Sequence, residues 1–176
     1  MLKKIKINYE PVEMMLFYWE SVASKEKVVD SYFIEVANKD EMQVLYKEGF
    51  APDSVRKVLS AIVNRELMNS PTKLESKFWN ANMWMLEDLG NMRSMLKPIK
   101  LLNLDDLMKE FASESKYEEL VVNFIPGTDE TFYKEGNVLT VNFFRLMVDV
   151  ADPEVVKVEG QDFKEFMLEK AREVLK

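Results

Sequence analysis

Apolar residues in the first two-thirds of the chain recur three and four positions apart, which is the spacing of one face of an α-helix. Ser, Pro and Gly at helix-start and helix-end positions divide this pattern into segments. The segment 12–23 is apolar around most of its circumference, so it should be central to the fold. We expect about six helices between residues 11 and 112, at residues 12–23, 24–36, 38–49, from 52, from 71 and from 103.

The last third of the chain changes to the patterns of β-strands. Residues 120–125 form a continuous apolar run that is typical of a buried strand. Gly136-Asn137 between two short apolar runs predicts a hairpin, because both residues tolerate positive φ. The pattern further predicts a strand that turns into a short helix over residues 138–150, a strand at 155–158 and an amphipathic closing helix over about residues 161–175.

The opening residues 5–9 alternate apolar and polar, as a half-buried strand does. A lone strand needs partners, and the other candidate strands lie at the far end of the sequence. We therefore predict a single α+β domain over residues 1–176. Its helices, from about residues 11–112, should pack on a small, mainly antiparallel sheet from about residues 2–9 and 118–158.

Of the residues, 47% are hydrophobic and 31% are charged, which is the balance of a chain that can bury a core. No apolar run approaches the roughly 20 residues that cross a bilayer. Lys6 also interrupts the apolar segment that a secretion signal would need near the start of the chain. We expect a cytoplasmic protein without a membrane partner.

The chain contains no cysteine and no histidine. Disulfides, thiolate or imidazole-activated nucleophiles and zinc sites built from nitrogen and sulfur ligands are therefore excluded. Carboxylates remain, and Asp149 and Asp152 flank the end of an apolar run, where they could hold Mg²⁺ or Ca²⁺. A metal-dependent hydrolase would need at least three acidic groups in one cleft, and no spacing in the sequence indicates them. We assign no catalytic residue, no cofactor and no metal ligand.

Residues 41–66 resemble a helix-turn-helix, with a short helix, Gly49 and a second helix. Three polar residues of that second helix would then lie in the major groove of DNA: Ser54, Arg56 and Lys57. However, Leu45 stands where such motifs have a small residue, and the formal net charge of −7 repels phosphate backbones. A DNA-binding transcriptional regulator is therefore an alternative function, with nucleic acid a disfavoured partner.

The chain has 12 methionines, many of them near aromatic residues, and methionine adapts to varied apolar partners. Most such residues fill a core, but Trp79 and Trp84 are five positions apart and cannot share one narrow helical face. One of them should therefore reach a surface. Arg145 stands in an apolar stretch and must reach water, a carboxylate or an anionic ligand. The residues we predict to bind a ligand are Trp19, Trp79, Met83, Trp84 and Arg145.

These features favour a non-enzymatic binding or interaction domain that senses a small apolar ligand or a protein partner. A homodimer is compatible with this interpretation. Two alternatives stay open, the DNA-binding regulator that uses residues 41–66 and the carboxylate- or metal-dependent hydrolase.

Two short segments, residues 9–15 (YEPVEMM) and residues 121–127 (VVNFIPG), resemble an uncharacterised domain. In some bacteria that domain is joined to winged-helix regulators of the arsenical-repressor type. The resemblance implies a ligand- or partner-sensing role rather than catalysis.

Overall fold

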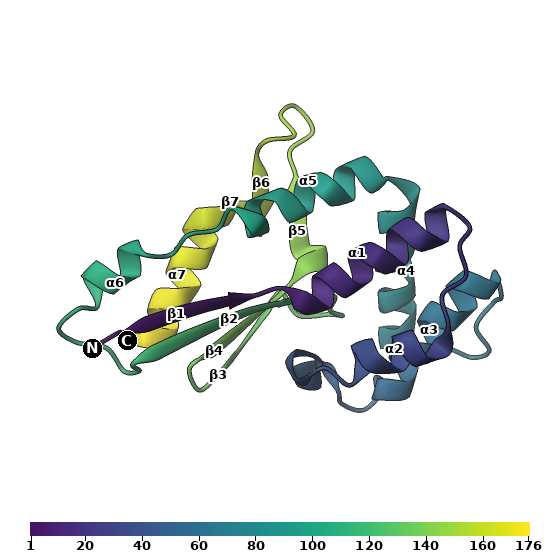
Figure 1. Ribbon diagram of the computed structural model, residues 1–176, viewed down its shortest axis with the longest axis horizontal. Helices are drawn as coiled ribbons and strands as arrows, with labels where there is room; N and C mark the ends of the chain where they lie inside the picture. Colours follow the sequence, from purple (N-terminus) through teal and green to yellow (C-terminus); the bar gives the residue numbers. More distant parts are fainter.

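The computed structural model describes residues 1–176, and Figure 1 shows a sheet at one end and a group of helices at the other. The N-terminal part contains β1 (Lys4–Asn8), α1 (Glu10–Ala23), α2 (Asp30–Ala37), the 3-10 helix η1 (Asp40–Leu45), α3 (Pro52–Asn64), α4 (Lys73–Glu87), α5 (Leu89–Lys100) and α6 (Asp106–Glu110). The C-terminal part contains β2 (Glu119–Ile125), β3 (Phe132–Glu135), β4 (Val138–Asn142), the 3-10 helix η2 (Phe143–Arg145), β5 (Leu146–Val148), β6 (Val156–Val158), β7 (Gln161–Asp162) and α7 (Phe163–Leu175). The predicted α+β class, with its helical middle, is confirmed.

The main sheet has the strand order β1-β2-β4-β3. β3 and β4 form the hairpin predicted at Gly136-Asn137, and β4 lies on the inside, next to β2. Because the chain reverses into β3 and again into β4, β4 runs parallel to β2. The N-terminal strand joins this sheet as predicted, but it also pairs in parallel, so the main sheet is mixed. The long helical connection between β1 and β2 allows either direction, whereas a tight hairpin allows only one.

A second sheet, β5-β6-β7, is antiparallel throughout. The connection between β5 and β6 protrudes from the body of the molecule (Figure 1), and Val150 within it is fully exposed. The chain then leads from β7 directly into α7, which packs against β2, β4 and β6. The predicted strand after residue 155 and the closing helix are thus both present.

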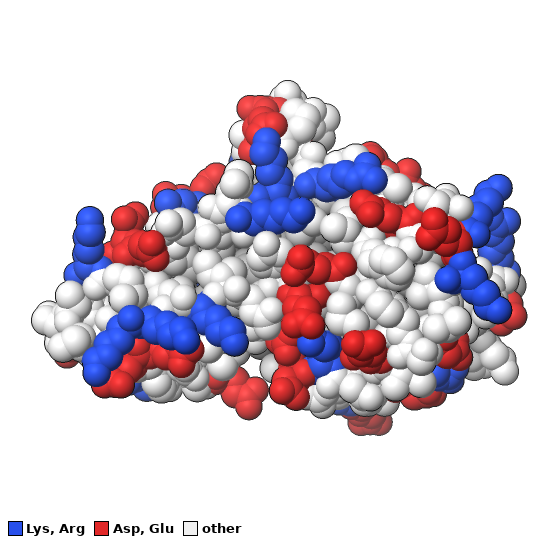
Figure 2. Space-filling model, in the orientation of Figure 1, with Lys and Arg blue, Asp and Glu red and all other residues white.

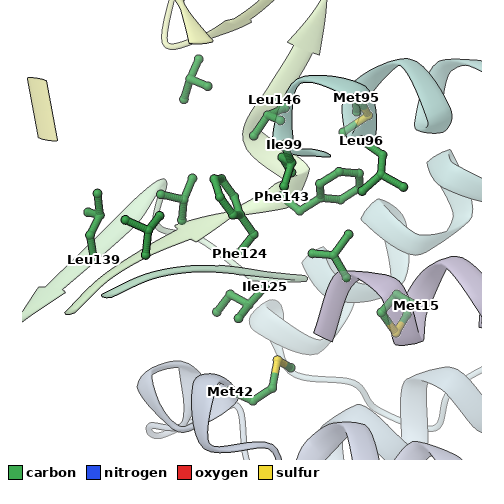
Figure 3. Close-up of a cluster of buried hydrophobic side chains, with 14 of the residues drawn as sticks. Met15, Met42, Met95, Leu96, Ile99, Phe124, Ile125, Leu139, Phe143 and Leu146 are labelled. Atoms are coloured by element: carbon green, nitrogen blue, oxygen red, sulfur yellow. The ribbon is translucent and has the colours of Figure 1, made fainter. Parts of the chain in front are cut away.

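The two faces of the main sheet have different environments. Phe124 of β2 points to the α7 side, where its ring lies 6.0 Å from that of Phe163. Figure 3 shows Ile125 on the opposite side of the strand, toward Met42 of η1. A continuous cluster of buried hydrophobic side chains extends from both faces into α1, α3, α4 and α5. The same core therefore holds the helical and sheet parts together.

The helix predicted over residues 24–36 begins later than expected, at Asp30. Lys25 has a φ of 61°, and the Glu26 N–H donates to the Ser21 carbonyl, so the chain makes a turn after α1. The segment predicted as a helix over residues 38–49 is a 3-10 helix that ends at Leu45. A turn closed by hydrogen bonds between Lys47 and Phe50 follows it.

Gly90 and Pro98, residue types that often end a helix, both lie within α5. The helix boundary falls instead at Asp88, whose side chain accepts a hydrogen bond from the Asn91 N–H and caps α5. A capping carboxylate supplies the partner that the first turn of a helix lacks, so a break forms without glycine. No helix combines the length and the apolar character that a membrane span needs.

Candidate functional site

An apolar groove of about 490 Å³ opens where the end of α4, the start of α5 and β5 meet. Seven of its nine lining residues are hydrophobic, so its walls favour apolar contacts over polar ones. The lining residues are Ala81, Trp84, Met85, Asp88, Asn91, Met95, Phe144, Leu146 and Met147.

Trp84 reaches this groove because of its position on α4. Phe78, Asn82 and Met85 are buried on the inner side of the helix. Trp84 lies one residue before Met85, about 100° around the helix axis, and its side chain is 68% exposed. Trp79 is half-buried against the core. The prediction that one of these two tryptophans reaches a surface is confirmed, and that residue is Trp84.

The other residues that we predicted to bind a ligand do not gather around Trp84. Trp19 is fully buried, and its indole N–H donates to Asn82 Oδ1 at 2.9 Å. Met83 is half-buried against the core. Arg145 is exposed, and its guanidinium donates to the backbone carbonyl of Asp129. The groove instead brings Trp84 together with Met95, Phe144 and Met147, which share no sequence motif.

The polar residues predicted to read DNA all make contacts within the chain. Ser54 is buried, and its hydroxyl donates to Glu75 at 2.7 Å. Lys57 lies 3.3 Å from the same carboxylate. Arg56 pairs with Asp53 at 2.8 Å. Since η1 also stands where the motif needs a first α-helix, the geometry gives the DNA-binding alternative no support.

Glu75 is a buried carboxylate that the sequence analysis did not single out. It accepts hydrogen bonds from the Thr72 backbone N–H at 2.9 Å and from the Ser54 hydroxyl. Burial opposes its ionisation, but these bonds and Lys57 outweigh burial and hold the pKa of Glu75 below its ordinary value. Thr72 in turn accepts from the Glu75 N–H, so the two form a capping box at the start of α4. The T-x-x-E spacing of residues 72–75 was the signal that could have identified it.

The acidic residues considered for a metal site have local roles in turns. Asp149 accepts hydrogen bonds from the backbone N–H groups of Ala151 and Asp152, and Asp152 accepts one from Glu154. No three acidic side chains of the chain lie close enough together to hold a metal ion. The convergence of three acidic groups on one point, which a metal-dependent hydrolase would need, is therefore not seen.

A second hollow, of about 550 Å³, crosses the face of the main sheet that is turned toward η1. We call it the sheet-face cleft. Its lining residues are Lys6, Asn8, Asp40, Glu41, Gln43, Val44, Val121, Asn123, Glu135, Val138 and Thr140. The strand register aligns four polar residues across this face, one from each strand: Asn8, Asn123, Thr140 and Tyr133. We call these four residues the polar row.

Two members of the polar row have unpartnered atoms. Asn123 is only 8% exposed, and its Oδ1 has no hydrogen-bond partner. The Tyr133 hydroxyl is also buried without a partner, and burial raises the pKa of this phenol above its ordinary value, which already lies well above neutral pH. Asn8, by contrast, donates to Glu41 at 3.1 Å. An asparagine inside an apolar strand was a signal in the sequence, but only the register shows that the row exists.

No known protein family, curated protein or solved structure matches this chain. The resemblance in residues 9–15 and 121–127 thus receives no support from these comparisons.

Proposed function

We propose that this chain is a non-enzymatic binding domain that docks an apolar segment of a protein partner in the groove around Trp84. The observation that carries the proposal is the exposure of Trp84 and Met147, 68% and 65% respectively, at the margins of one apolar groove. Large apolar side chains that stay in water at the edge of a hollow are typical of interaction sites.

The open form of the groove favours a protein segment over a small apolar molecule. A small-molecule site usually encloses most of its ligand, whereas here the largest lining side chain remains mostly in solvent. A helix or strand of a partner could cover Trp84 while it inserts an apolar side chain toward Phe144. Tryptophan also provides a large rigid contact surface at little entropic cost.

The rim of the groove adds a charge preference. Asp88 lines it, and the neighbouring Glu87 is exposed. No basic residue is among the lining residues, and the exposed Lys157, which pairs with Met147 across the strands, lies at the other end of the groove from Asp88. We therefore expect the partner segment to carry a leucine, methionine or aromatic anchor flanked by lysine or arginine, since opposite charges steer association.

A peptide-display selection on the full chain tests this function. The selection uses the wild-type chain as bait, after depletion on a Trp84→Ser/Met147→Ser variant. Selected peptides should contain apolar anchors with basic neighbours. Their amide chemical-shift changes, measured by NMR on the labelled chain, should centre on Ala81, Asn91 and Met147. A matched control is Leu67→Ser, because Leu67 is 94% exposed and lies outside the groove.

Several results would contradict the proposal. If the peptides bound the double variant as tightly as the wild type, the groove would not be the binding site. Concentration-dependent dimers that dissociate in the Trp84→Ser variant would show that a second copy of the chain occupies the groove. An apolar adduct seen by native mass spectrometry, and lost in the same variant, would replace the protein partner with a small ligand.

A further inference from the structure

The sheet-face cleft is separate from the groove and has the opposite character. Three carboxylates line it, on Asp40, Glu41 and Glu135, against a single ammonium group on Lys6. Figure 2 shows further acidic side chains gathered over the start of α1 and over η1, beside the sheet. Glu10 and Glu13 lie in that first turn of α1, where Glu10 is paired with Lys39 at 2.7 Å and Glu13 adds an acidic charge. The cleft therefore attracts cations.

The positions of these acids exclude a compact cation. No three of them approach closely enough to share a metal ion. Asp40 and Glu41 belong to η1, whereas Glu135 lies on β3, at the far edge of the sheet from β1. Glu41 accepts a hydrogen bond from Asn8 of the edge strand β1, and three strand spacings, about 14 Å, separate this strand from β3. A ligand that meets acids at such separated positions must carry more than one positive group.

Asn123 adds a specific requirement, because its carboxamide oxygen can only accept a hydrogen bond. This oxygen lacks a partner although the residue is more than nine-tenths buried and lines the cleft. A buried polar atom without a partner destabilises the fold unless something supplies the missing bond. A ligand N–H group would satisfy it.

The apolar part of the cleft lining fits the remainder of such a ligand. Val121 and Val138 are neighbours in the sheet register, and Val44 lines the cleft from η1. These side chains can contact methylene groups but offer no polar partner. An aliphatic chain between two amino groups would therefore lie over the valines, with its charged ends at the polar positions.

We propose that the sheet-face cleft binds a small aliphatic diamine or polyamine, with one amino group donating to Asn123 Oδ1 and pairing with Glu41. The site does not depend on the groove around Trp84, so either proposal can fail while the other stands. Lys6 opposes binding, and its charge limits the affinity of the site.

Calorimetric titration of the full chain with putrescine and with spermidine tests the proposal. We expect saturable binding that weakens as salt is added, because the attraction is between charges. The monoamine n-butylamine, which has one charge and the same carbon chain as putrescine, should bind at least about tenfold more weakly. The proposal would be overturned if neither putrescine nor spermidine gave saturable heat, or if butylamine bound as tightly as putrescine. Tighter binding of magnesium chloride than of spermidine would also overturn it.

Two matched pairs of variants locate the site. Lys6→Gln should tighten spermidine binding about threefold, and Glu41→Gln should weaken it about threefold, as expected for partly exposed charges. Lys4→Gln is the control for the first, because Lys4 lies on the same strand and the same sheet face outside the cleft lining. Glu48→Gln is the control for the second, since Glu48 is exposed and lies outside the cleft lining.

Asn123→Leu should reduce spermidine affinity about tenfold or more, because it removes the acceptor. Circular dichroism establishes first that this variant folds. If this variant does not fold, the comparisons of Lys6→Gln with Lys4→Gln and of Glu41→Gln with Glu48→Gln decide alone whether spermidine binds in the cleft. If each variant and its control bound spermidine with equal affinity, spermidine would bind elsewhere and the site would be rejected.

Discussion

The side chain of Asn142 fills the space next to Gly127, so that a Cβ at residue 127 would lie 2.5 Å from the Cγ of Asn142. Asn142 is fully buried, and its Oδ1 accepts the N–H groups of Gly127 and Phe144, both at 3.0 Å. Its amide nitrogen donates to the Glu130 carbonyl at 3.0 Å. Asn142 thus fixes the connection between β2 and β3 against the end of β4.

Gly127→Ala should destabilise the fold by about 1–3 kcal/mol, because the added methyl group cannot fit without displacing Asn142. Urea unfolding at neutral pH measures the change in the free energy of unfolding. Gly90→Ala is the control. Gly90 lies within α5, and the nearest atom to its Cβ would be an Asp88 oxygen at 3.4 Å. That variant should be neutral or more stable by up to about 1 kcal/mol. Equal effects of the two substitutions would refute the role of Asn142.

Asn82→Ala should cost about 2 kcal/mol, because the fully buried Trp19 indole N–H would lose its acceptor. The nitrogen of the Asn82 side chain donates to the Phe78 carbonyl one turn earlier in α4. Both polar atoms of this buried side chain are therefore hydrogen-bonded in the folded chain. Thermal unfolding compares this variant with Asn80→Ala, an exposed position on the same helix. The Asn80 variant should change stability by less than about 0.5 kcal/mol. A small effect at Asn82 would mean that the Trp19 bond contributes little.

The hydrogen bonds that Glu75 accepts make stability depend on pH. The pKa of Glu75 is lower in the folded chain than its ordinary value of 4.5, so the unfolded chain binds the proton more readily. The stabilisation is fully present above that ordinary value and is lost as the pH falls through the folded pKa. The free energy of unfolding of the wild type should therefore fall more steeply between about pH 5 and about pH 3 than that of Glu75→Gln.

At neutral pH, Glu75→Gln should be less stable than the wild type by about 1–3 kcal/mol, and the difference should narrow on acidification. Glu87→Gln, an exposed position at the end of the same helix, is the matched control and should follow the wild type. Parallel curves for wild type and Glu75→Gln would show that the carboxylate is not stabilised by folding.

Substitution by leucine should have very different effects on stability at the buried and the exposed tryptophan. Trp19→Leu should cost about 3 kcal/mol, because it leaves a cavity beside Phe143 and leaves Asn82 without its donor. Trp84→Leu should change stability by less than about 0.5 kcal/mol, because the side chain is mostly in solvent. Guanidinium unfolding of both variants measures the contrast. A large loss at Trp84 would indicate that it supports the core rather than a binding surface.

The sequence was most informative where one local rule acted alone. The hairpin at Gly136-Asn137 formed as predicted, because a two-residue turn depends on local backbone freedom, which Gly136 supplies with a φ of 59°. α3 begins at Pro52 for a similarly local reason. The start of α2 and the break at Asp88 were missed. The turn before α2 depends on the bond from the Glu26 N–H to the Ser21 carbonyl, and the break depends on the bond from the Asn91 N–H to Asp88. Other residues nearby in the sequence could have formed similar bonds, so the pattern alone did not select these two.

The candidate sites were less accessible to prediction than the elements. Helical spacing was enough to show that Trp79 and Trp84 face different directions. It did not show which of them would be buried, because burial depends on what packs against α4. Of the five residues predicted to bind a ligand, Trp84 alone lines the apolar groove.

The sequence by itself determined the α+β class, most of the helices and strands, and the exclusion of cysteine and histidine chemistry. These properties depend on composition and on spacing along the chain. Only the tertiary structure decided that β1 and β2, more than 100 residues apart, pair in parallel and align Asn8 with Asn123. It also placed Met147 beside Trp84 and Glu75 beside Ser54. Such pairings depend on the packing of the whole core, which the spacing of residues within one segment does not specify.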